Sequence, residues 1–227
     1  MTGHTRRAAD KAGLSPETIV RRAIATADAE GLDAVTIRRL ARELGVTPMA
    51  LYWHFRNKDE LLDAMAASVF DEIDLPMDAT ASWRRQLGAV LASLVAALRA
   101  HPAIAPLIAM RTVSTEGSLR VTEVLLDALR RGGFSPAEAT QIARHALAVA
   151  TSLVAPMPGV VALAEPDGMA DARHQARQAL AALPAEQYPR LVEAAGPLSE
   201  GVAPDAYIAF GLDLLLAGIE AMAARSD

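Results

Sequence analysis

The chain contains no cysteine among its 227 residues. This absence excludes disulfide bonds, thiolate nucleophiles and cysteine-ligated metal sites. The N-terminal sequence MTGHTRRAADKAG lacks the apolar segment of a secretory signal. The most apolar stretch, YIAFGLDLLLAGIEAMAA, contains Asp213 and Glu220, so we interpret it as a buried helix rather than a membrane span. These features favour a cytoplasmic protein.

The sequence also lacks the usual signatures of catalysis and of cofactor binding. The patterns G-x-S-x-G, G-x-x-x-x-G-K-[ST], H-E-x-x-H and G-x-G-x-x-G are all missing. His101, His145 and His174 have no histidine partner four residues away, so no metal site is indicated. An enzyme fused to a binding domain is therefore disfavoured, and we expect no metal and no cofactor. The acidic residues Asp71, Glu72 and Asp74 are typical of a solvated helix end.

Positive charge is outnumbered by negative charge overall but is concentrated near the N-terminus. The net charge is −5, yet residues 1–58 contain ten Lys/Arg against six acids, a balance of +4 that leaves −9 for the remainder. A basic head on an acidic body indicates that the head alone meets a polyanion. A solvated basic surface without a partner is an equally good explanation of the charge by itself.

Strand signals are weak too, because no β-branched alternation occurs and the single Asp-Gly pair, at 167–168, is not flanked by alternating apolar runs. Capping residues instead divide the chain into helices: Ser15 and Pro16 open the first, Thr36 the second, Thr47 and Pro48 the third, and Asn57 the fourth. The expected helices cover 16–30, 37–44, a third that starts at Pro48, 58–73, 83–100, a short segment after Pro102, 116–131, 136–157, one helix near 170–183 within the Pro/Gly/Ala-rich segment 158–203, and 204–224.

The two short helices joined by ELGVT form a helix-turn-helix pattern. Aromatic residues are only 4% of the chain, yet Tyr52, Trp53 and Phe55 lie together after this turn. We expect Phe55 and Trp53 to pack in the core, while Tyr52 and His54 point outward to phosphates or to a thymine methyl. Lys58, at the start of the next helix, would meet a phosphate beside that helix's N-terminal N–H groups.

The segment TIRRLARELGVTPMALYWHFRNKDELLDAM resembles the DNA-binding domain of the TetR family of bacterial repressors, especially the tetracycline-repressor branch. The resemblance runs from about Leu14 to Ile73. The segments LLDALRRGGFSPAEA and FGLDLLLAGIEA are similar, more weakly, to the C-terminal domain of that branch. The resemblance implies an all-α fold with a three-helix helix-turn-helix head over 14–75, a flexible basic arm over 1–13, and an effector-binding and dimerisation domain over 76–227.

The resemblance also implies DNA contacts at particular positions. Arg38 would reach a guanine edge or a phosphate, and Pro48 and Met49 would make apolar contacts in the groove. Contacts to the DNA backbone would come from Thr36, Thr47, Tyr52, His54 and Lys58. Pro48 replaces a base-reading glutamine of the tetracycline-repressor branch, so direct base reading is expected to be sparse. The basic arm could enter the minor groove, although a disordered terminus explains it equally well.

The same resemblance implies an effector pocket in the body, but this sequence argues against magnesium–tetracycline. Val90 and Leu94 occupy the positions of a ligand-binding asparagine and phenylalanine, and the position of the metal-binding histidine falls near Ala109 or Met110. We therefore expect an apolar pocket, although the same apolar spacing is typical of plain core. Its candidate lining is Val90, Leu94, Ile104, Leu107, Met110, Thr112, Leu147, Thr151 and Met157, with Arg111 and His145 as polar anchors.

The helices at 136–157 and 204–224 are apolar on more than one face. A second copy of the chain would cover the surplus in a four-helix dimer interface, while a central helix of a single body is the alternative. A homodimer would read a palindromic operator with half-sites roughly 34–36 Å apart. The sequence thus predicts a DNA-binding repressor that a small lipophilic effector releases; an activator or an effector-independent regulator is the alternative.

Overall fold

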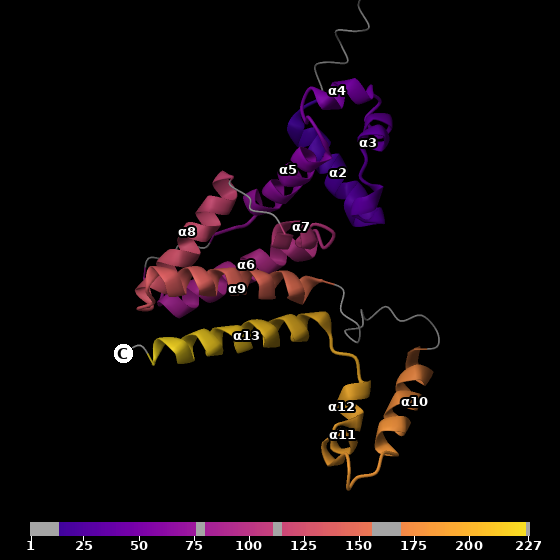
Figure 1. Ribbon diagram of the computed structural model, residues 1–227, viewed down its shortest axis with the longest axis vertical. Helices are drawn as coiled ribbons and strands as arrows, with labels where there is room; N and C mark the ends of the chain where they lie inside the picture. The colour runs from indigo at the N-terminus through magenta and orange to yellow at the C-terminus, as the bar shows by residue number, and fades with distance from the viewer. Residues whose placement is uncertain (1–13, 76–79, 111–114, 156–168, 226–227) are drawn as a thin grey trace, which may run out of the picture. The chain divides into compact units, whose positions relative to one another are not determined.

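The computed structural model describes residues 14–75, 80–110, 115–155 and 169–225. Within these residues every regular secondary-structure element is a helix, as the sequence predicts (Figure 1). Two compact units are present: residues 1–155 together with 214–227 form the first, and residues 156–213 form the second.

The N-terminal part of the first unit contains α2 (Pro16–Glu30), the 3-10 turn η1 (Leu32–Ala34), α3 (Ile37–Glu43), α4 (Pro48–Tyr52) and α5 (Lys58–Asp71). Ser15 accepts a hydrogen bond from the Thr18 backbone N–H at 3.2 Å and so caps α2. Asn57 caps α5 in the same way, accepting from the Glu60 N–H at 2.8 Å. Both predicted caps are confirmed, and α5 ends at Asp71, two residues before the predicted end.

The turn between α3 and α4 depends on Gly45, whose φ of 69° lies in the left-handed region that glycine adopts without strain. After this turn, the Val46 N–H donates to the Ala41 carbonyl at 2.9 Å and brings α4 back against α3. Leu40, Ala41 and Leu51 are fully buried between the two helices and their neighbours. The predicted helix-turn-helix is therefore present, with α4 as the second helix.

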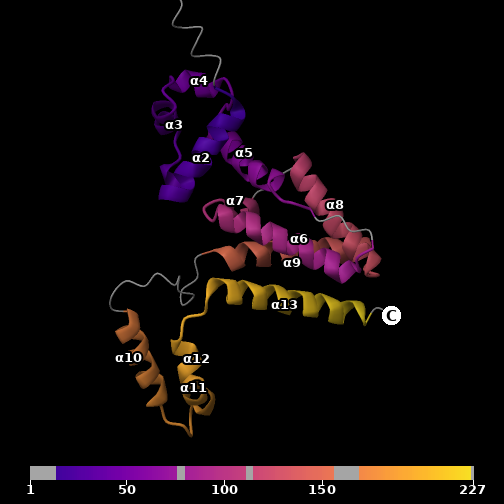
Figure 2. The same ribbon diagram turned by 180° about the vertical axis from the view of Figure 1, so that it is seen from behind.

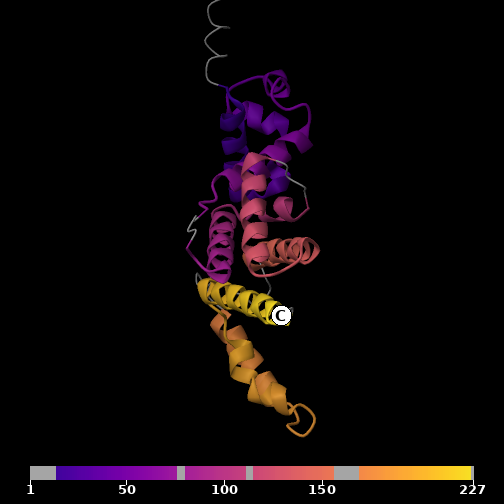
Figure 3. The ribbon, with the colours of Figure 1, turned by 90° about the vertical axis from the view of Figure 1, so that its left-hand side faces the viewer.

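The body of the first unit contains α6 (Trp83–Ala100), α7 (Ala105–Met110), α8 (Glu116–Arg131) and α9 (Pro136–Val154). Helix α6 packs against α8 and α9, and α5 packs against α6, α7 and α8 (Figures 2 and 3). The Trp83 and Phe134 rings meet edge to face at 6.1 Å. A Cβ atom on Gly132 would lie 2.9 Å from Trp83, so only glycine fits beside this pair.

The second unit contains α10 (Met169–Ala181), α11 (Pro189–Glu193) and α12 (Ala195–Ser199), with α10 packed against the other two. The predicted helix near 170–183 is confirmed as α10, but the sequence did not predict α11 and α12. Each of these has only five residues, which is too short to show a clear apolar period.

The last helix, α13 (Pro204–Ala223), has a mean hydropathy of 1.6 over its most apolar window. By length and composition alone it could cross a membrane, yet only 11% of that window is buried. Phe210 is 69% exposed and Leu214 is 64% exposed. The prediction of a buried helix is wrong for the single chain, because the apolar residues surround the helix and one chain covers only part of it.

Candidate nucleic-acid interface and ligand site

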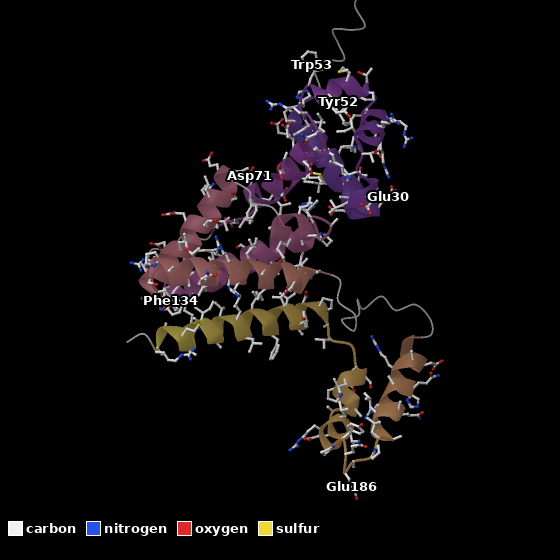
Figure 4. All side chains as sticks on the ribbon, in the orientation of Figure 1. Glu30, Tyr52, Trp53, Asp71, Phe134 and Glu186 are labelled. Carbon is white, nitrogen blue, oxygen red and sulfur yellow. The ribbon has the colours of Figure 1, made fainter. Side chains whose placement is uncertain are left out.

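The eight residues predicted to contact DNA all lie exposed on the head, from the start of α3 through α4 to the start of α5. Helix α4 carries the largest apolar side chains of this set, with Met49 65% exposed and Tyr52 46% exposed. Figure 4 shows the labelled Tyr52 at α4, at the end of the head away from the body. The exposed set, which we call the α4 face, is Thr36, Arg38, Thr47, Pro48, Met49, Tyr52, His54 and Lys58.

The aromatic cluster divides between core and solvent, with one difference from the prediction. Leu51 is fully buried and Phe55 is 6% exposed, so these two form the inner side as expected. Trp53, however, is 83% exposed, and its predicted core packing is wrong (Figure 4). Successive helical residues differ by about 100°, so Trp53 lies roughly opposite Leu51. This spacing could have identified Trp53 as a further exposed residue beside the α4 face.

The two capping threonines of the α4 face behave differently. The Thr36 hydroxyl accepts from the Arg39 N–H at 3.2 Å and caps α3. Thr47 is at the N-cap position of α4 but makes no capping hydrogen bond through its side chain. The predicted capping role of Thr47 is therefore wrong. Its exposed hydroxyl can donate a hydrogen bond to a phosphate oxygen without breaking a helix cap.

Arg39, which the sequence interpretation did not single out, holds α3 on α2. Its Nε donates to Glu43 at 2.7 Å, its Nη1 donates to Glu30 at 2.7 Å, and its Nη2 also pairs with Glu30. Glu43 additionally accepts from the Thr26 hydroxyl at 3.2 Å. Hydrogen bonding to Arg39 lowers the pKa of both glutamates. This network fixes α3, while the neighbouring Arg38 remains exposed.

Arg56, which is not among the predicted DNA contacts, lies two residues before the exposed Lys58 at the start of α5. The Arg56 guanidinium is 89% exposed and lies 3.7 Å from the Glu60 carboxylate. The other Glu60 oxygen accepts from the Arg56 backbone N–H at 2.7 Å. Because Asn57 already occupies the Glu60 N–H, fewer free N–H groups remain for a phosphate at this end than a bare helix offers.

The head is joined to the body through His101, which follows α6. Its Nδ1 lies 2.8 Å from the Asp28 carboxylate on α2, and its Nε2 lies 3.2 Å from the Glu72 carboxylate at the end of α5. Burial disfavours the charged imidazole, but Asp28 and Glu72 outweigh that effect, and the pKa of His101 is raised. A cavity of about 870 Å³ opens beside this contact and is lined mainly by α2 and α5.

The predicted effector-pocket residues are spread between core, surface and undescribed segments. Val90 and Leu94 are buried on α6, Ile104 is buried just before α7 and Leu107 is buried on α7, and both helices pack against α9. Thr151 is buried and donates to the Leu147 carbonyl at 3.1 Å, whereas Leu147 itself is half-buried. His145 is exposed on α9 and its Nδ1 lies 2.9 Å from the Gln141 carbonyl. The Met110 side chain, Arg111, Thr112 and Met157 lie outside the described residues.

Within the described parts of the chain, no group of three or more His, Asp or Glu side chains is arranged to hold a metal ion. The Asp28–His101–Glu72 contact brings two carboxylates to one imidazole, which is a hydrogen-bonded geometry with both ring nitrogens occupied. These atoms can exchange a proton with solvent, and they connect three helices of the first unit.

Comparisons with known proteins agree with this arrangement. Residues 19–65 match the family described as "Bacterial regulatory proteins, tetR family", and residues 75–223 match "Tetracyclin repressor-like, C-terminal domain". An HTH-type transcriptional regulator of Saccharopolyspora erythraea is 34% identical over 55% of the chain, and this match spans about half of that regulator's length (53%). The class C tetracycline repressor protein of Escherichia coli is 32% identical over 92% of each chain.

Among solved structures, ActR of Streptomyces coelicolor in complex with actinorhodin is 30% identical and superposes with a TM-score of 0.78. The superposition covers 93% of this chain and 99% of ActR. The family matches cover both the helix-turn-helix and the helical body, and the role they indicate is regulatory rather than enzymatic. The chain therefore belongs to the TetR family of transcriptional regulators, with a DNA-binding helix-turn-helix head and a ligand-binding C-terminal domain.

Proposed function

We propose that the protein is a homodimeric repressor that leaves a palindromic operator when a small lipophilic molecule binds its body. The observation that carries this proposal is the α4 face, on which every residue predicted to contact DNA is exposed. The Arg39 network and the buried Leu51 and Phe55 hold this face rigid from behind. Because the side chains of such a surface are already ordered, little binding free energy is lost in ordering them when DNA binds.

A dimer through α9 and α13 is supported by the apolar surface that one chain leaves uncovered. Phe210 and Leu214 are four residues apart on α13, and small residues continue the same side at Gly218 and Ala221. Apart from the chain neighbours of Gly218 and the backbone of its own helix, no described atom lies within 4 Å of the position that a Cβ on Gly218 would occupy. A second α13 could therefore approach closely here, and a two-fold pair of heads would match the symmetry of a palindrome.

An apolar effector is supported by the side chains that surround the core of the body. Val90 and Leu94 offer no polar atom at positions where the tetracycline-repressor branch binds its ligand. ActR, solved with actinorhodin bound, supports a small-molecule effector in a body of this shape. Release follows if the effector prefers a body in which the heads are spaced differently from the DNA-bound state.

The first test measures fluorescence anisotropy of a labelled duplex from immediately upstream of the protein's own gene, with a random duplex of equal length as control. Measurements at about 50 mM and about 200 mM salt should show weakening by a factor of 10³ or more if six or more phosphates are contacted. Arg38→Ala should weaken specific binding about 5–150-fold, the usual cost of a lost base contact. Equal, salt-independent binding to both duplexes would refute the proposed role of the head.

The matched control is Arg190→Ala on α11, which also removes an arginine that is 88% exposed. It should leave operator affinity unchanged, because Arg190 lies outside the head and pairs with Glu193.

Addition of tetracycline with Mg²⁺ should leave the protein bound to its operator. Release of the protein from DNA by magnesium–tetracycline would contradict the apolar pocket. Repression, as opposed to activation, is tested by deletion of the gene, which should raise expression of its target.

Leu214→Glu tests the dimer, and sedimentation velocity is the measurement. A carboxylate in the centre of an apolar interface would lose its hydration, so the variant should sediment as a monomer while the wild type sediments as a dimer. Glu123→Ala on the exposed side of α8 serves as the control and should remain dimeric. A dimeric Leu214→Glu variant would place the interface elsewhere.

A further inference from the structure

The contact between His101, Asp28 and Glu72, which we call the His101 clasp, joins the two functional parts of the molecule. His101 is the C-cap residue of α6, and its carbonyl accepts from the Ile104 N–H at 2.9 Å just before α7. The backbone of His101 thus belongs to the body, where effector is expected. Its side chain instead contacts α2 and the end of α5, which belong to the head.

Both clasp contacts can be hydrogen bonds at the same time only when the imidazole is protonated. An ionised carboxylate accepts hydrogen bonds but cannot donate them. A neutral imidazole has a single N–H, so it can serve either Asp28 or Glu72 and leaves its other nitrogen facing an acceptor. The imidazolium donates from both nitrogens, and the distances of 2.8 and 3.2 Å fit two such bonds. The clasp is therefore complete only with one added proton.

The charged groups around His101 favour that proton. From α2 the cavity wall presents Asp28 and Glu17 together with Arg21, and from α5 it presents Asp63 and Asp71, with Glu72 directly after. Burial opposes the imidazolium, the hydrogen bond and charge of Asp28 favour it, and Glu72 adds to them, so the pKa of His101 is raised. Helix α7 contributes no charged residue, and the last turn of α6 contributes Arg99.

A second contact keeps the head attached when the clasp is open. The N-terminus of α8 approaches the end of α5 so closely that a Cβ on Gly117 would lie 3.1 Å from the Asp71 backbone nitrogen. This contact involves backbone atoms and does not depend on a proton. Opening the clasp therefore leaves α5 held against α8, and α5 also keeps its packing on α6 and α7, so the head stays attached to the body.

We propose that His101 is a positioning residue that fixes the DNA-binding head on the ligand-binding body only while it carries a proton. This inference rests on the proposed function, because a fixed head determines the spacing of the two α4 faces in a dimer. A raised folded-state pKa means that the stabilisation is complete below the ordinary histidine value of about 6.5 and is lost as the pH rises through the raised value. Each unit by which the carboxylates raise this pKa favours the clasp tenfold.

The test uses the absence of cysteine, since spin labels at Arg42→Cys on α3 and Glu123→Cys on α8 require no other change. Labelled protein is mixed with excess unlabelled protein so that each dimer carries one label pair. The label-to-label distance distribution is then measured by pulsed electron paramagnetic resonance at about pH 5.5 and about pH 8.5, on either side of the ordinary histidine range. The distribution should be narrow at the lower pH and broader at the higher pH.

Three variants separate positioning from simple structural support. His101→Gln should show the broad distribution at both pH values, and His101→Arg, a permanent cation with several donors, should stay narrow at both. Asp28→Asn with Glu72→Gln keeps His101 but should abolish the pH response, which provides an independent route if a His101 variant fails to fold. A wild-type distribution that does not change with pH, or a response that survives in His101→Gln, would overturn the proposal.

The same variants are then examined by operator anisotropy at both pH values, with His54 intact and again in a His54→Gln background that removes the one described histidine of the head. Operator affinity should change with pH when His101 is present and should lose that response in His101→Gln. A pH response of the labels without any response of affinity would overturn the positioning role. Absence of specific DNA binding by the protein with His54 intact, at both pH values, would instead refute the proposed function and leave the label result unaffected.

Discussion

Gly117→Ala tests how closely α8 approaches α5. The added methyl group would overlap the Asp71 carboxylate and would lie 3.1 Å from both the Asp71 nitrogen and the Phe70 carbonyl carbon. The Asp71 side chain is at the surface and can rotate away, but the two backbone atoms can yield only if α5 moves relative to α8. Overpacking of this kind costs about 1–3 kcal/mol. Alanine recovers roughly 0.5–1 kcal/mol of that by its higher helix propensity.

We therefore expect Gly117→Ala to lower the free energy of unfolding by about 1–2 kcal/mol, with a fall in Tm of roughly 2–4 °C for each kcal/mol in a chain of this size. Urea and thermal unfolding at one fixed chain concentration are the assays, because dimerisation makes Tm depend on concentration. In an Asp71→Ala background the loss should shrink but persist, since the backbone contacts remain.

Gly196→Ala on α12 is the matched control, because the nearest atom to its added Cβ is 3.8 Å away, an ordinary contact distance. This variant should be as stable as the wild type or more stable. If Gly117→Ala proves equally harmless, the close approach of the two helices is wrong, and with it the proton-independent contact that keeps the head attached when the clasp is open.

Three further predictions concern the head. Trp53→Phe should remove most of the acrylamide-quenchable fluorescence, leaving the half-buried Trp83, and should change stability by less than about 0.5 kcal/mol. Equal quenching in both proteins would contradict the exposure of Trp53. Arg39→Ala should reduce the loss of stability in acid. Glu30 and Glu43 have lowered pKa values in the folded state, so their contribution to stability disappears as the pH falls through those values. An unchanged dependence of urea unfolding on pH would contradict the pairing of Arg39 with these glutamates. Asn57→Ala should destabilise α5 by about 1 kcal/mol through loss of its cap, measured by urea unfolding against Asn57→Asp, which retains an acceptor.

The features that the sequence predicted are those encoded within a few neighbouring residues. Ser15, Asn57 and Ser135 each cap a helix through a backbone N–H three residues later, so the signal and its partner are adjacent in the chain. Gly45 marks the helix-turn-helix for the same reason, since one residue supplies the left-handed turn. Local signals of this kind located α2 to α9 before any tertiary contact was known.

The features that the sequence did not predict depend on contacts between distant residues or on the limits of one chain. Asp28 and His101 are 73 positions apart, and neither lies in a motif that points to the other. The sequence predicts Trp53 in the core because aromatic residues usually pack there, although its angle relative to Leu51 places it outside. The apolar composition of α13 predicts that the helix is covered, by a second copy or within one body, but composition does not reveal which of these applies.

The acidic end of α5 connects these two kinds of feature. Glu72 is the C-cap of α5 and Asp71 is its last residue, although negative charge beside a helix C-terminus opposes the helix dipole. An unfavourable local choice has to be offset elsewhere in the folded protein. Asp71 lies against the start of α8 at Gly117, where the helix dipole favours negative charge, and Glu72 lies against His101. Since successive helical residues differ by about 100°, two adjacent acids can meet two different helices of the body. The cluster that looked like an ordinary solvated helix end is thus the place where α5 meets both α6 and α8.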